Sequence, residues 1–566
     1  MSQAPPILIA GAGPVGLVTA IVLRQHSIPV RIIEKEPVPK LASRASGIMP
    51  RTLEIYHFLG VLPYILKAAG QAPVIVDYEI PGGERVLETF RMFPHVDATP
   101  SRPFLQCKAL SQSLSQDILR AHLARFGTEV EMGTELRDFE QCDDHVVASI
   151  VKKSADGKES TESYSASYLV GTDGAKGITR RRLGLTLDGE SRENLSFVFA
   201  DIRLRGLEGN FWHKWGEISN KMITIRKTEF SKEHFWLLAG GQNLDTNGLQ
   251  PNPKSVTEWI KLQTGRGDIE IVEVINFSNY KPSMRMVKEF SKGRVFLAGD
   301  AAHIHSPAGG QGLNNGIADA WLLSWRLALA HKGLASAELL ASYTAERAPV
   351  IKVMLEHTTA ILNAQIAATW GKFGYGNWRP DKAPLWQLDI NYRWSPVVFD
   401  ETATAVSDET ASNTAPGVQE GNDIRAGDRA PDAPSLLDIL SAPPSVKRLF
   451  DYFKSTQHTV LVFASSEAKI NSFASALNNV PAEVVQSAVI IPQETPVREQ
   501  DLETEFTWTS KVDHALKDCD AHMYRAYRPE GSQDEVAVIV RPDDIIGAIV
   551  KSGEGITKYF SKILAA

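Results

Sequence analysis

The chain has 566 residues, which is too many for one hydrophobic core, so we expect two or three domains. Its net charge of −7 gives no reason to expect nucleic acid or an anionic membrane surface as a partner. The three cysteines form no CxxC pair and no metal-ligand cluster, which predicts no metal site and favours a reducing compartment, the cytoplasm. No stretch is long and apolar enough to predict a membrane span.

The first predicted unit is strand, turn, helix and strand, from Ile7 to Glu36. An apolar strand leads into the run GAGPVG, and a second strand after the helix ends at Glu34. In this context the glycines predict a dinucleotide site, with the pyrophosphate at the helix N-terminus and the acidic residue at a ribose hydroxyl. A signal peptide or membrane span is rejected, because no basic residue precedes the run and glycines interrupt it.

Three further stretches follow in order. From Ser43 to Ile55, two arginines flank a loop of small residues. From Tyr168 to Leu185, an apolar strand end leads to an Asp-Gly turn and a basic run, which by itself is typical of a solvated helix face. From Leu195 to Lys288, aromatic and β-branched residues alternate with short turns, which predicts a mostly antiparallel sheet.

The stretch from Gly293 to Trp321 reads as a strand, a sharp turn at Asp300, a glycine loop and a helix. Such a loop offers main-chain N–H groups and a positive helix end to an electron-rich or anionic group. Asp300 can accept hydrogen bonds from sugar hydroxyls. For this loop alone, a simple turn with a capping aspartate would be the preferred interpretation.

The chain as a whole resembles the aromatic-hydroxylase family of single-component FAD-dependent monooxygenases, in particular its phenol-hydroxylase-like branch. The resemblance is carried by GAGPVG (Gly11–Gly16), SRASGIMPRTLEI (Ser43–Ile55), GTDGAKGITRRRLG (Gly171–Gly184) and GRVFLAGDAAHIHSPAGGQGLNNGIADA (Gly293–Ala320). It covers about the first two thirds of the chain strongly and extends more weakly to the end.

The resemblance implies an α/β protein with a Rossmann-type FAD-binding domain, an antiparallel-sheet substrate domain and a C-terminal thioredoxin-like α/β domain. We expect the FAD-binding domain, with a helical extension, at 1–194 and 289–400, the substrate sheet at 195–288, a linker at 401–424 and the thioredoxin-like domain at 425–566. Apolar strands are predicted in the last part at 459–464, 488–491 and 536–540. Without a CxxC pair, thioredoxin-type redox activity is not expected.

The implied activity is hydroxylation of a phenolic or other electron-rich aromatic molecule with O2. NADPH, or NADH, would reduce FAD, and the reduced flavin would form a hydroperoxide that transfers oxygen to the ring. A homodimer is the implied assembly.

The resemblance also assigns residues to the cofactor, and one departure stands out. Many phenol hydroxylases have an acidic residue where Ser46 stands here, which puts proton chemistry at this loop in doubt. The FAD candidates are Gly11, Gly13, Gly16, Glu34, Lys35, Arg44, Ser46, Gly47, Gln106, Asp300, Gly310, Gly312, Leu313 and Asn314.

On the substrate side, the candidates are Pro307, His234, Trp236 and Arg226. His234 and Trp236 are two residues apart and face one side of a strand. A tyrosine often stands in the branch where Trp236 is, so His234 is the first choice for a base, and Arg226 and His213 are weaker ones. For each of them an ordinary structural role is an equally good interpretation.

Three alternatives stay open. A flavin halogenase shares the fold but needs a Trp-x-Trp-x-Ile motif, and this chain has Trp212-His213-Lys214-Trp215. The chain could also be another oxidoreductase, such as a plain NAD-binding dehydrogenase, or a non-catalytic flavin-fold protein that binds a partner.

Overall fold

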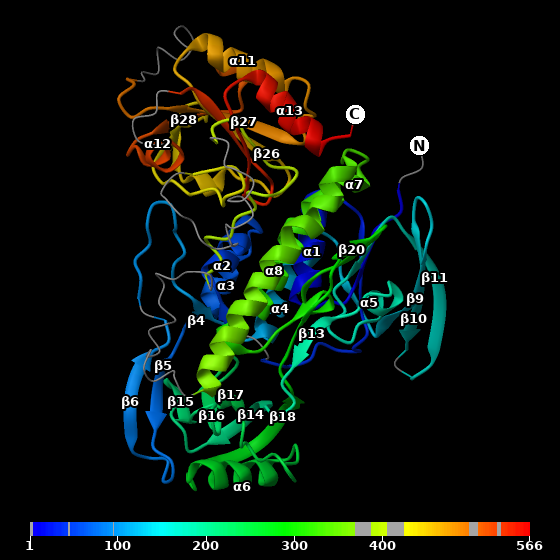
Figure 1. The fold of residues 1–566 in the computed structure, drawn as a ribbon, viewed down its shortest axis with the longest axis vertical. Helices are drawn as coiled ribbons and strands as arrows, with labels where there is room; N and C mark the ends of the chain where they lie inside the picture. The colour runs from blue at the N-terminus through cyan, green and yellow to red at the C-terminus, as the bar shows by residue number, and fades with distance from the viewer. Residues whose placement is uncertain are drawn as a thin grey trace.

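The computed structural model places three assemblies of strands and helices along one axis of the molecule (Figure 1). A C-terminal sheet lies at one end, a parallel sheet with long helices in the middle, and an antiparallel sheet at the other end. The described residues are 4–43, 46–93, 95–154, 156–367, 386–403, 424–496, 508–528 and 534–565.

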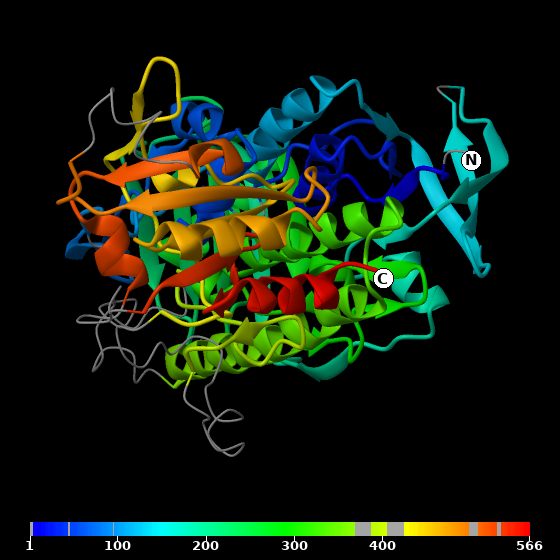
Figure 2. The same cartoon turned by 90° about the horizontal axis from the view of Figure 1, so that it is seen from above.

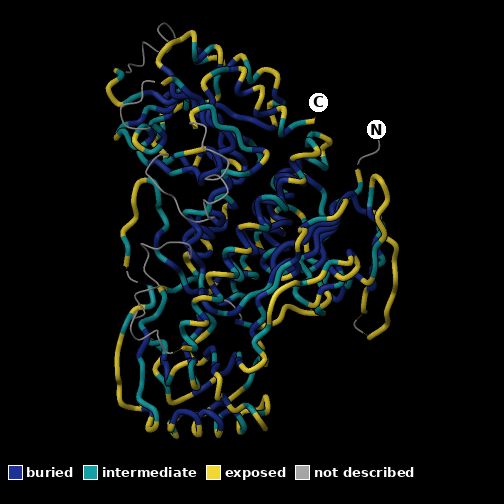
Figure 3. Tube along the Cα trace, in the orientation of Figure 1, coloured by how far each residue is buried: buried dark blue, intermediate teal, exposed yellow. Residues whose placement is uncertain are grey.

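The parallel sheet forms from short apolar runs that are almost fully buried, as expected where helices cover both faces. Its strand order is β20-β21-β12-β1-β2-β8, and β20 alone runs antiparallel to its neighbour. The tube coloured by burial shows this sheet as the most continuous buried region of the middle part (Figure 3). The strands are β1 (Ile7–Ala10), β2 (Val30–Glu34), β8 (Val130–Met132), β12 (Leu169–Gly171), β20 (Ser291–Lys292) and β21 (Val295–Leu297).

The helices of the middle part include the two that the glycine motifs predicted. Helix α1 packs against both α7 and α4, and the 30-residue α8 runs from the C-terminal sheet toward the antiparallel sheet (Figure 1). The helices are α1 (Pro14–Gln25), α2 (Pro50–Phe58), α3 (Leu62–Ala68), α4 (Gln112–Ala124), α5 (Ile178–Arg182), α7 (Gly312–His331) and α8 (Ala337–Ile366). Three small sheets complete it: β3 (Gly47–Ile48), β7 (Lys108–Ala109) and β4 (Gly70–Gln71); β9 (Thr134–Gln141), β10 (Val146–Lys153) and β11 (Glu159–Ala166); and β13 (Asp188–Ser191), β19 (Ser283–Met286) and β22 (His303–Ile304).

The antiparallel sheet has the order β18-β14-β17-β16-β15-β5-β6. Strands β5 and β6 come from residues 74–91, outside the range 195–288 that the composition indicated, because β5 pairs in parallel with β15 across a long stretch of chain. One face is apolar and packs on α6 (Pro253–Thr264). The strands are β5 (Val74–Tyr78), β6 (Val86–Arg91), β14 (Ser196–Arg205), β15 (Phe211–Gly216), β16 (Met222–Lys227), β17 (His234–Gly241) and β18 (Glu270–Tyr280).

The C-terminal sheet is mixed, with the order β23-β30-β29-β26-β27-β28-β24-β25, and it includes the three apolar strands predicted there. Helices α11 and α13 lie side by side against it (Figure 2). The elements are β23 (Phe399–Asp400), β24 (Leu436–Asp438), β25 (Ser445–Lys447), β26 (His458–Phe463), α11 (Glu467–Leu477), β27 (Val485–Ile491), β28 (His514–Asp518), α12 (His522–Tyr527), β29 (Val536–Val540), β30 (Ile546–Val550) and α13 (Gly553–Ile563).

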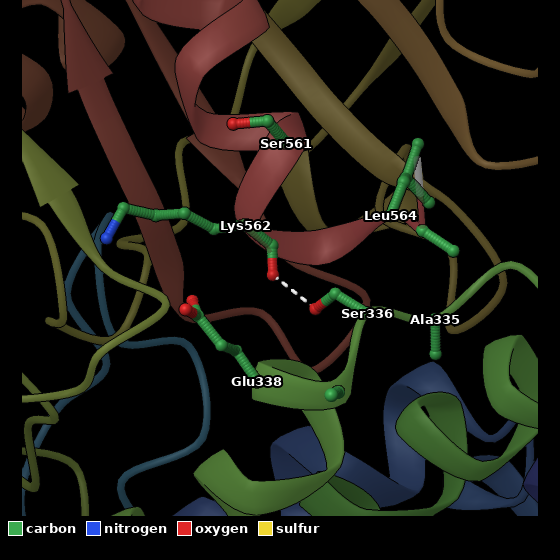
Figure 4. Close-up of a pocket in the computed structure, with 8 residues that line it drawn as sticks. Ala335, Ser336, Glu338, Ser561, Lys562 and Leu564 are labelled. Atoms are coloured by element: carbon green, nitrogen blue, oxygen red, sulfur yellow. Dashed lines mark hydrogen bonds between the residues drawn. The ribbon is translucent and has the colours of Figure 1, made fainter.

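Polar contacts join the C-terminal sheet to the middle part. Where α8 begins, the Ser336 hydroxyl donates a hydrogen bond of 2.6 Å to the carbonyl of Lys562 at the end of α13 (Figure 4). A hollow of about 580 Å³ lies beside this contact, open at the surface and lined by small side chains with Glu338 and Lys562. It lies at the junction of two helices, away from the glycine turns.

A buried ion pair forms the centre of the same junction. Asp544, in the turn between β29 and β30, accepts hydrogen bonds from both terminal nitrogens of Arg51 and from the indole of Trp321 at 2.9 Å. Its φ of +54° is a conformation that L-residues rarely adopt, and such a conformation persists only where surrounding contacts impose it. Arg51 also pairs with Glu54 at 3.0 Å, so α2, α7 and the C-terminal sheet meet at this point.

A second buried network lies one turn along α7. Arg326 and Arg541 both bind Glu346, at 2.6 and 2.7 Å, and both also bind Asp543. Burial alone would raise the pKa of Asp543, but Arg541 and Arg326 outweigh it and hold that pKa at about 2. The charges therefore persist in the interior, and removing any one of them leaves the others uncompensated.

The part of the chain that the structure describes contains neither a membrane-spanning helix nor a metal-binding cluster. No helix there combines the length and apolar character that crossing a membrane requires. Within the same residues, no group of three His, Cys, Asp or Glu side chains is placed to hold a metal ion.

The junction yields a testable prediction. Asp544→Asn keeps the side-chain shape and tolerates positive φ, but removes the charge opposite Arg51, so we expect the free energy of unfolding to fall by about 3 kcal/mol. Urea unfolding followed by fluorescence measures it. Asp117→Asn, which disturbs the exposed pair with Arg120, is the control and should change stability by less than about 0.5 kcal/mol. Equal midpoints for the two variants would contradict the prediction.

Candidate functional site

The three glycines of the turn between β1 and α1 meet three different constraints. Gly11 has a φ of +105°, and a Cβ there would lie 2.5 Å from the carbonyl oxygen of Thr172. A Cβ at Gly16 would lie 2.1 Å from the carbonyl oxygen of Gly11, so only glycine lets α1 pack on the turn. A Cβ at Gly13 would meet no atom within 4 Å, so this position faces open space at the helix N-terminus. A pyrophosphate at a helix N-terminus requires this arrangement.

Glu34 lies beside this turn, because β1 and β2 are parallel neighbours that end at the same edge. Its carboxylate accepts hydrogen bonds from the main-chain N–H of Ala12 at 3.0 Å and of Glu36 at 3.1 Å. Lys35, which follows it, is exposed. Glu34 therefore lies next to the glycine turn, as the sequence predicted.

The loop after Ser43 is joined to the start of α7 through Asn314. The side-chain oxygen of Asn314 accepts from Met49 N at 3.0 Å and from the Thr52 hydroxyl at 2.7 Å. Its nitrogen donates to the carbonyls of Gly47 at 3.1 Å and Gly310 at 2.9 Å. Since both amide atoms are used within the protein, the group that Asn314 can offer to a cofactor is its main-chain N–H.

Other loop candidates are placed as follows. The Ser46 carbonyl accepts a 2.8 Å hydrogen bond from Leu110 N, which brings the loop next to α4. The side-chain nitrogen of Gln106 donates one of its two hydrogens to the carbonyl of Val96, which leaves its second N–H and its oxygen for a flavin. Arg44 lies outside the described residues.

Asp300 follows β21 in a tight turn, and its side chain is exposed at the carboxyl end of the parallel sheet. The turn is held from behind by Asp319 of α7. One oxygen of Asp319 accepts from Gly299 N at 2.9 Å and lies 2.7 Å from His303 Nε2, and the other accepts from Arg347 at 2.7 Å. Burial would raise the pKa of Asp319, but Arg347 and His303 outweigh it and lower that pKa, so the carboxylate stays charged.

The loop that follows connects the turn to α7 and packs on the antiparallel sheet. Burial lowers the pKa of His305 to about 4, so its ring is neutral near pH 7, and its Nδ1 donates to the Ser306 carbonyl at 2.6 Å. The Tyr280 hydroxyl donates to the carbonyl of His305 at 2.8 Å. Ala308, directly after Pro307, packs in one apolar cluster with residues of the sheet. The remaining candidates lie where the loop enters the helix: Gly310, with φ of +61°, and Gly312 and Leu313 in the first turn of α7.

The Asp-Gly turn after β12 is tied to the same region. Asp173 caps α5 by accepting 2.9 Å hydrogen bonds from the N–H and the hydroxyl of Thr179. Burial raises the pKa of Asp173. Arg180 of α5 donates to the carbonyl of Ala301, the residue after Asp300, at 3.3 Å. The glycine turn after β1, the Asp-Gly turn after β12 and the turn after β21 are therefore in contact.

The face of the antiparallel sheet opposite α6 carries a row of polar and aromatic side chains. Trp212, Arg226, Trp236 and Asp201 are register neighbours across β15, β16, β17 and β14. The Arg226 guanidinium lies 5.7 Å from the ring centre of Trp236, and the two indoles meet edge to face at 6.1 Å. Trp212 Nε1, Arg226 Nη2 and Asp201 Oδ1 are buried and make no hydrogen bond within the described part of the chain. The row thus offers polar atoms to a molecule lying against the indoles.

Main-chain contacts turn this face toward the loops described above. Asp201 Oδ2 accepts from Ser43 N at 2.8 Å, at the start of the small-residue loop. Glu229, which pairs with Arg226 at 3.2 Å, accepts from Ser111 N at 2.8 Å, at the start of α4. The polar row therefore lies on the side of the sheet that contacts the glycine-motif half of the molecule.

The two candidate histidines lie on opposite faces. His234 is buried on the polar face, with Nε2 at 3.4 Å from Asp201 Oδ1. His213 is on the α6 face, where it is hydrogen-bonded to the Tyr78 hydroxyl at 2.8 Å and to the Glu208 carbonyl at 2.7 Å. His213 is thus wrong as an alternative base, because adjacent residues of a strand point to opposite sides and it is adjacent to Trp212.

Sequence reasoning missed Asp201, Trp212 and Asp319. Asp201 is the one carboxylate inside the apolar strand SFVFADIRLR, and a charge in such a place signals a buried partner or a site. The sequence draws attention to Trp212 only through its spacing to Trp215, which bears on the halogenase motif. Asp319 carried no signal in a single sequence, because its partners come from two other stretches of the chain, the turn at 299–303 and α8.

An FAD molecule fits these residues on the observations above. The open N-terminus of α1 at Gly13 suits the pyrophosphate, Glu34 the ribose, and Asp300 with the first turn of α7 the rest of the cofactor. Three turns converge there from β1, β12 and β21, at the carboxyl ends where open α/β sheets bind ligands.

Comparisons with known proteins agree. Residues 5–358 match the family model described as the FAD binding domain. A flavin-dependent monooxygenase of Mycobacteroides abscessus is 31% identical over 99% of this chain and 100% of its own length. A pentachlorophenol 4-monooxygenase of Sphingobium chlorophenolicum is 28% identical over 82% of this chain and 81% of its own. A solved aklavinone-11 hydroxylase in complex with FAD and aklavinone has a TM-score of 0.75 and 23% identity, covering 99% of each chain.

The geometry of the three turns and these matches lead to one conclusion: the chain belongs to the FAD-binding-domain family of flavin-dependent aromatic monooxygenases, and it is an enzyme of that class.

Proposed function

We propose that the protein uses NADPH, or NADH, and O2 to hydroxylate a phenolic or other electron-rich aromatic molecule. The observation that carries the proposal is the row from Trp212 to Asp201, where aromatic surface and unpartnered polar atoms lie together on the face that contacts the glycine-motif half. A flat ring with an oxygen substituent matches that chemistry. When bound, FAD would take electrons from the nicotinamide and use them to activate O2.

The side chains of the row have distinct roles in this proposal. Trp236 and Trp212 provide the surfaces on which the ring lies. Arg226 Nη2 and Trp212 Nε1 donate to a substrate oxygen and favour its ionised form, because an opposite charge in a buried place stabilises an anion. His234 takes the proton of the phenol, and Pro307 with the loop after it limits the space on the other side of the ring.

The base is needed for a general chemical reason. An electrophilic oxygen attacks a phenolate far more readily than a phenol, and a free phenol ionises near pH 10. Histidine titrates near neutral pH and can accept the proton directly or through water. Trp236 lacks the hydroxyl of the tyrosine that is common at its position in the branch, and Ser46 lacks the carboxylate that is common at its own.

The cofactor residues in the proposal follow from their placement. Main-chain N–H groups of the turn after β1 bind the pyrophosphate, Glu34 binds a ribose hydroxyl, and Asp300 binds the ribityl chain. The first turn of α7 presents N–H groups to the flavin ring. The halogenase alternative gains no support, since Trp212 and Trp215 point to opposite faces of the sheet.

The C-terminal unit, assembly and location complete the proposal. We assign the mixed sheet with α11, α12 and α13 to a thioredoxin-like domain, and we expect no thioredoxin-type redox activity because its one cysteine, Cys519, has no CxxC partner. A homodimer in the reducing cytoplasm is the state that the resemblance and the cysteine content favour.

The first prediction concerns the cofactor. The purified protein should be yellow and release FAD on heating, and Asp300→Ala should weaken FAD binding while the protein still folds. A charged hydrogen bond to a hydroxyl contributes roughly 1.5–3 kcal/mol, so the FAD dissociation constant should rise about 10- to 100-fold. Fluorescence titration of the apoprotein measures it. Asp117→Asn is the control, and wild-type affinity in Asp300→Ala would leave Asp300 only a turn residue.

The second prediction concerns the base. His234→Ala should leave flavin reduction by NADPH intact but reduce the product formed per NADPH, with the lost oxygen appearing as hydrogen peroxide. General-base losses are about 10²–10⁴-fold. Product, peroxide and NADPH are measured across a phenol panel at several pH values. His213→Ala, on the opposite face, is the matched control, and an unchanged yield in His234→Ala would remove this residue from the mechanism.

The third prediction concerns the C-terminal unit. A chain that stops at residue 423 loses Asp543 and Asp544, which leaves Arg326 and Arg51 short of buried partners and exposes Trp321. Its thermal midpoint should fall, while NADPH should still reduce the FAD of the folded fraction. Stopped-flow absorbance tests this, and a folded, FAD-loaded truncation that is not reduced would refute it.

A further inference from the structure

Two buried ionisable side chains of the polar face, Asp201 and His234, lie close together, and the proposed function gives Asp201 no part in proton transfer. Asp201 on β14 is 1% exposed and His234 on β17 is 3% exposed. Asp201 Oδ1 and His234 Nε2 are 3.4 Å apart. Neither atom has a hydrogen-bond partner in the described part of the chain, and the two are within ion-pair distance of each other.

The strand register brings the two side chains together. β14 and β17 are antiparallel neighbours, with Asp201 opposite Trp236 and His234 opposite Arg203. Asp201 and His234 are therefore diagonal neighbours on one face, and diagonal pairs are within reach of long or aromatic side chains. Phe230, whose ring centre is 5.0 Å away, packs against the imidazole and limits its rotation.

Asp201 is itself fixed in place. Its second oxygen accepts the 2.8 Å hydrogen bond from Ser43 N, so the carboxylate is held between the imidazole and the loop that leads to the flavin site. A carboxylate with one oxygen anchored to main chain keeps its other oxygen in one direction. The pair is thus built into the fold from three segments: β14, β17 and the loop after β2.

The other charged groups around His234 are occupied elsewhere. Arg203, across the strand pair, is exposed and pairs with Glu273 of β18 at 3.2 Å. Arg226 pairs with Glu229 at 3.2 Å, and Glu233, the residue before His234, is exposed. Asp201 is the carboxylate that the structure places against the ring.

We infer that Asp201 is a positioning residue for His234: it holds the Nε2–H side of the imidazole and leaves the Nδ1 lone pair to accept the substrate proton. The inference rests on the proposed function. His234 Nδ1 makes no hydrogen bond to a described residue, and unlike Nε2 it is not among the fully buried atoms without a partner. In the step, the phenol O–H bond breaks and an Nδ1–H bond forms, giving a phenolate and an imidazolium whose positive charge faces the Asp201 carboxylate. An aspartate beside a catalytic histidine fixes the tautomer and stabilises the imidazolium in the same way in other enzymes.

This arrangement makes Asp201 matter only when the substrate arrives protonated. A phenol that is already ionised needs no base, whereas one that is protonated needs both residues. A merely structural role for Asp201, through Ser43 and the flavin loop, would affect both kinds of substrate equally. The acidity of the substrate therefore separates proton transfer from structure.

The experiment compares wild type, Asp201→Asn, His234→Gln and the double variant, each as FAD-loaded full-length protein. Asn at position 201 keeps an oxygen for Ser43 N but loses the charge. The substrates, both assayed at pH 8, are phenol, which is still protonated there, and para-nitrophenol, which is largely ionised there, and the readout is product per NADPH consumed. Glu273→Gln removes an exposed carboxylate from the same sheet and is the control.

With phenol, Asp201→Asn should lower the yield roughly 10²-fold, the lower end of general-base contributions, and the double variant should be no worse than His234→Gln alone. With para-nitrophenol, all variants should stay within about twofold of wild type, with wild-type FAD content. Equal losses with both substrates, no loss with phenol, or additive losses in the double variant would each overturn the inference. If wild type hydroxylates no member of the phenol panel, the proposed function itself fails. If His234→Gln forms as much product per NADPH from phenol as wild type does, the assignment of His234 as the base fails.

Discussion

The flavin site depends on the absence of side chains where three turns and two helices meet. A Cβ at Gly11 would lie 2.5 Å from the Thr172 carbonyl oxygen, and one at Gly299 or Gly316 would lie 2.8 or 2.7 Å from a methyl of Val15. Because main chain approaches main chain this closely, the turn after β1, the turn after β21 and α7 share one small volume. Free N–H groups and a helix N-terminus collect there, which is what an anionic dinucleotide needs.

Buried charge holds the remaining parts to this centre. Asp319 fixes the turn before Asp300 through Gly299, and Arg347 brings α8 to the same carboxylate. On the other side of α7, Asp543 and Asp544 attach the C-terminal sheet to its two tryptophans. Paired ions buried in this way specify one relative arrangement more than they stabilise it, since their desolvation offsets much of their attraction. The C-terminal unit is therefore part of the support of the flavin half, not an independent appendage.

One face of the antiparallel sheet packs on α6, and the other face carries the buried polar side chains. The α6 face is mainly apolar, and on it the two nitrogens of His213 are hydrogen-bonded to the Tyr78 hydroxyl and the Glu208 carbonyl. The opposite face keeps buried polar atoms without hydrogen-bond partners at Trp212 and Arg226, beside the Asp201–His234 pair. Folded proteins rarely leave such atoms unpaired, and where several occur together the natural explanation is a ligand that completes them.

The sequence by itself determined the glycine turns, the helices that follow them, the antiparallel sheet and the family, because these are local patterns. A strand followed by a glycine turn and a helix is recognisable without knowing what lies opposite. It also located Asp300 and Glu34, since each is fixed by its distance from such a turn along the chain.

Only the tertiary structure decided which side chains meet across segments. The Asn314 amide turned out to bind main chain on two loops, and Gln106 donates to Val96, which the motifs could not indicate. The rejection of His213 and the pairing of His234 with Asp201 depend on strand register, which one sequence does not contain. The physical reason is that these contacts join residues tens or hundreds of positions apart, and their energies depend on burial that exists only once the sheets have packed.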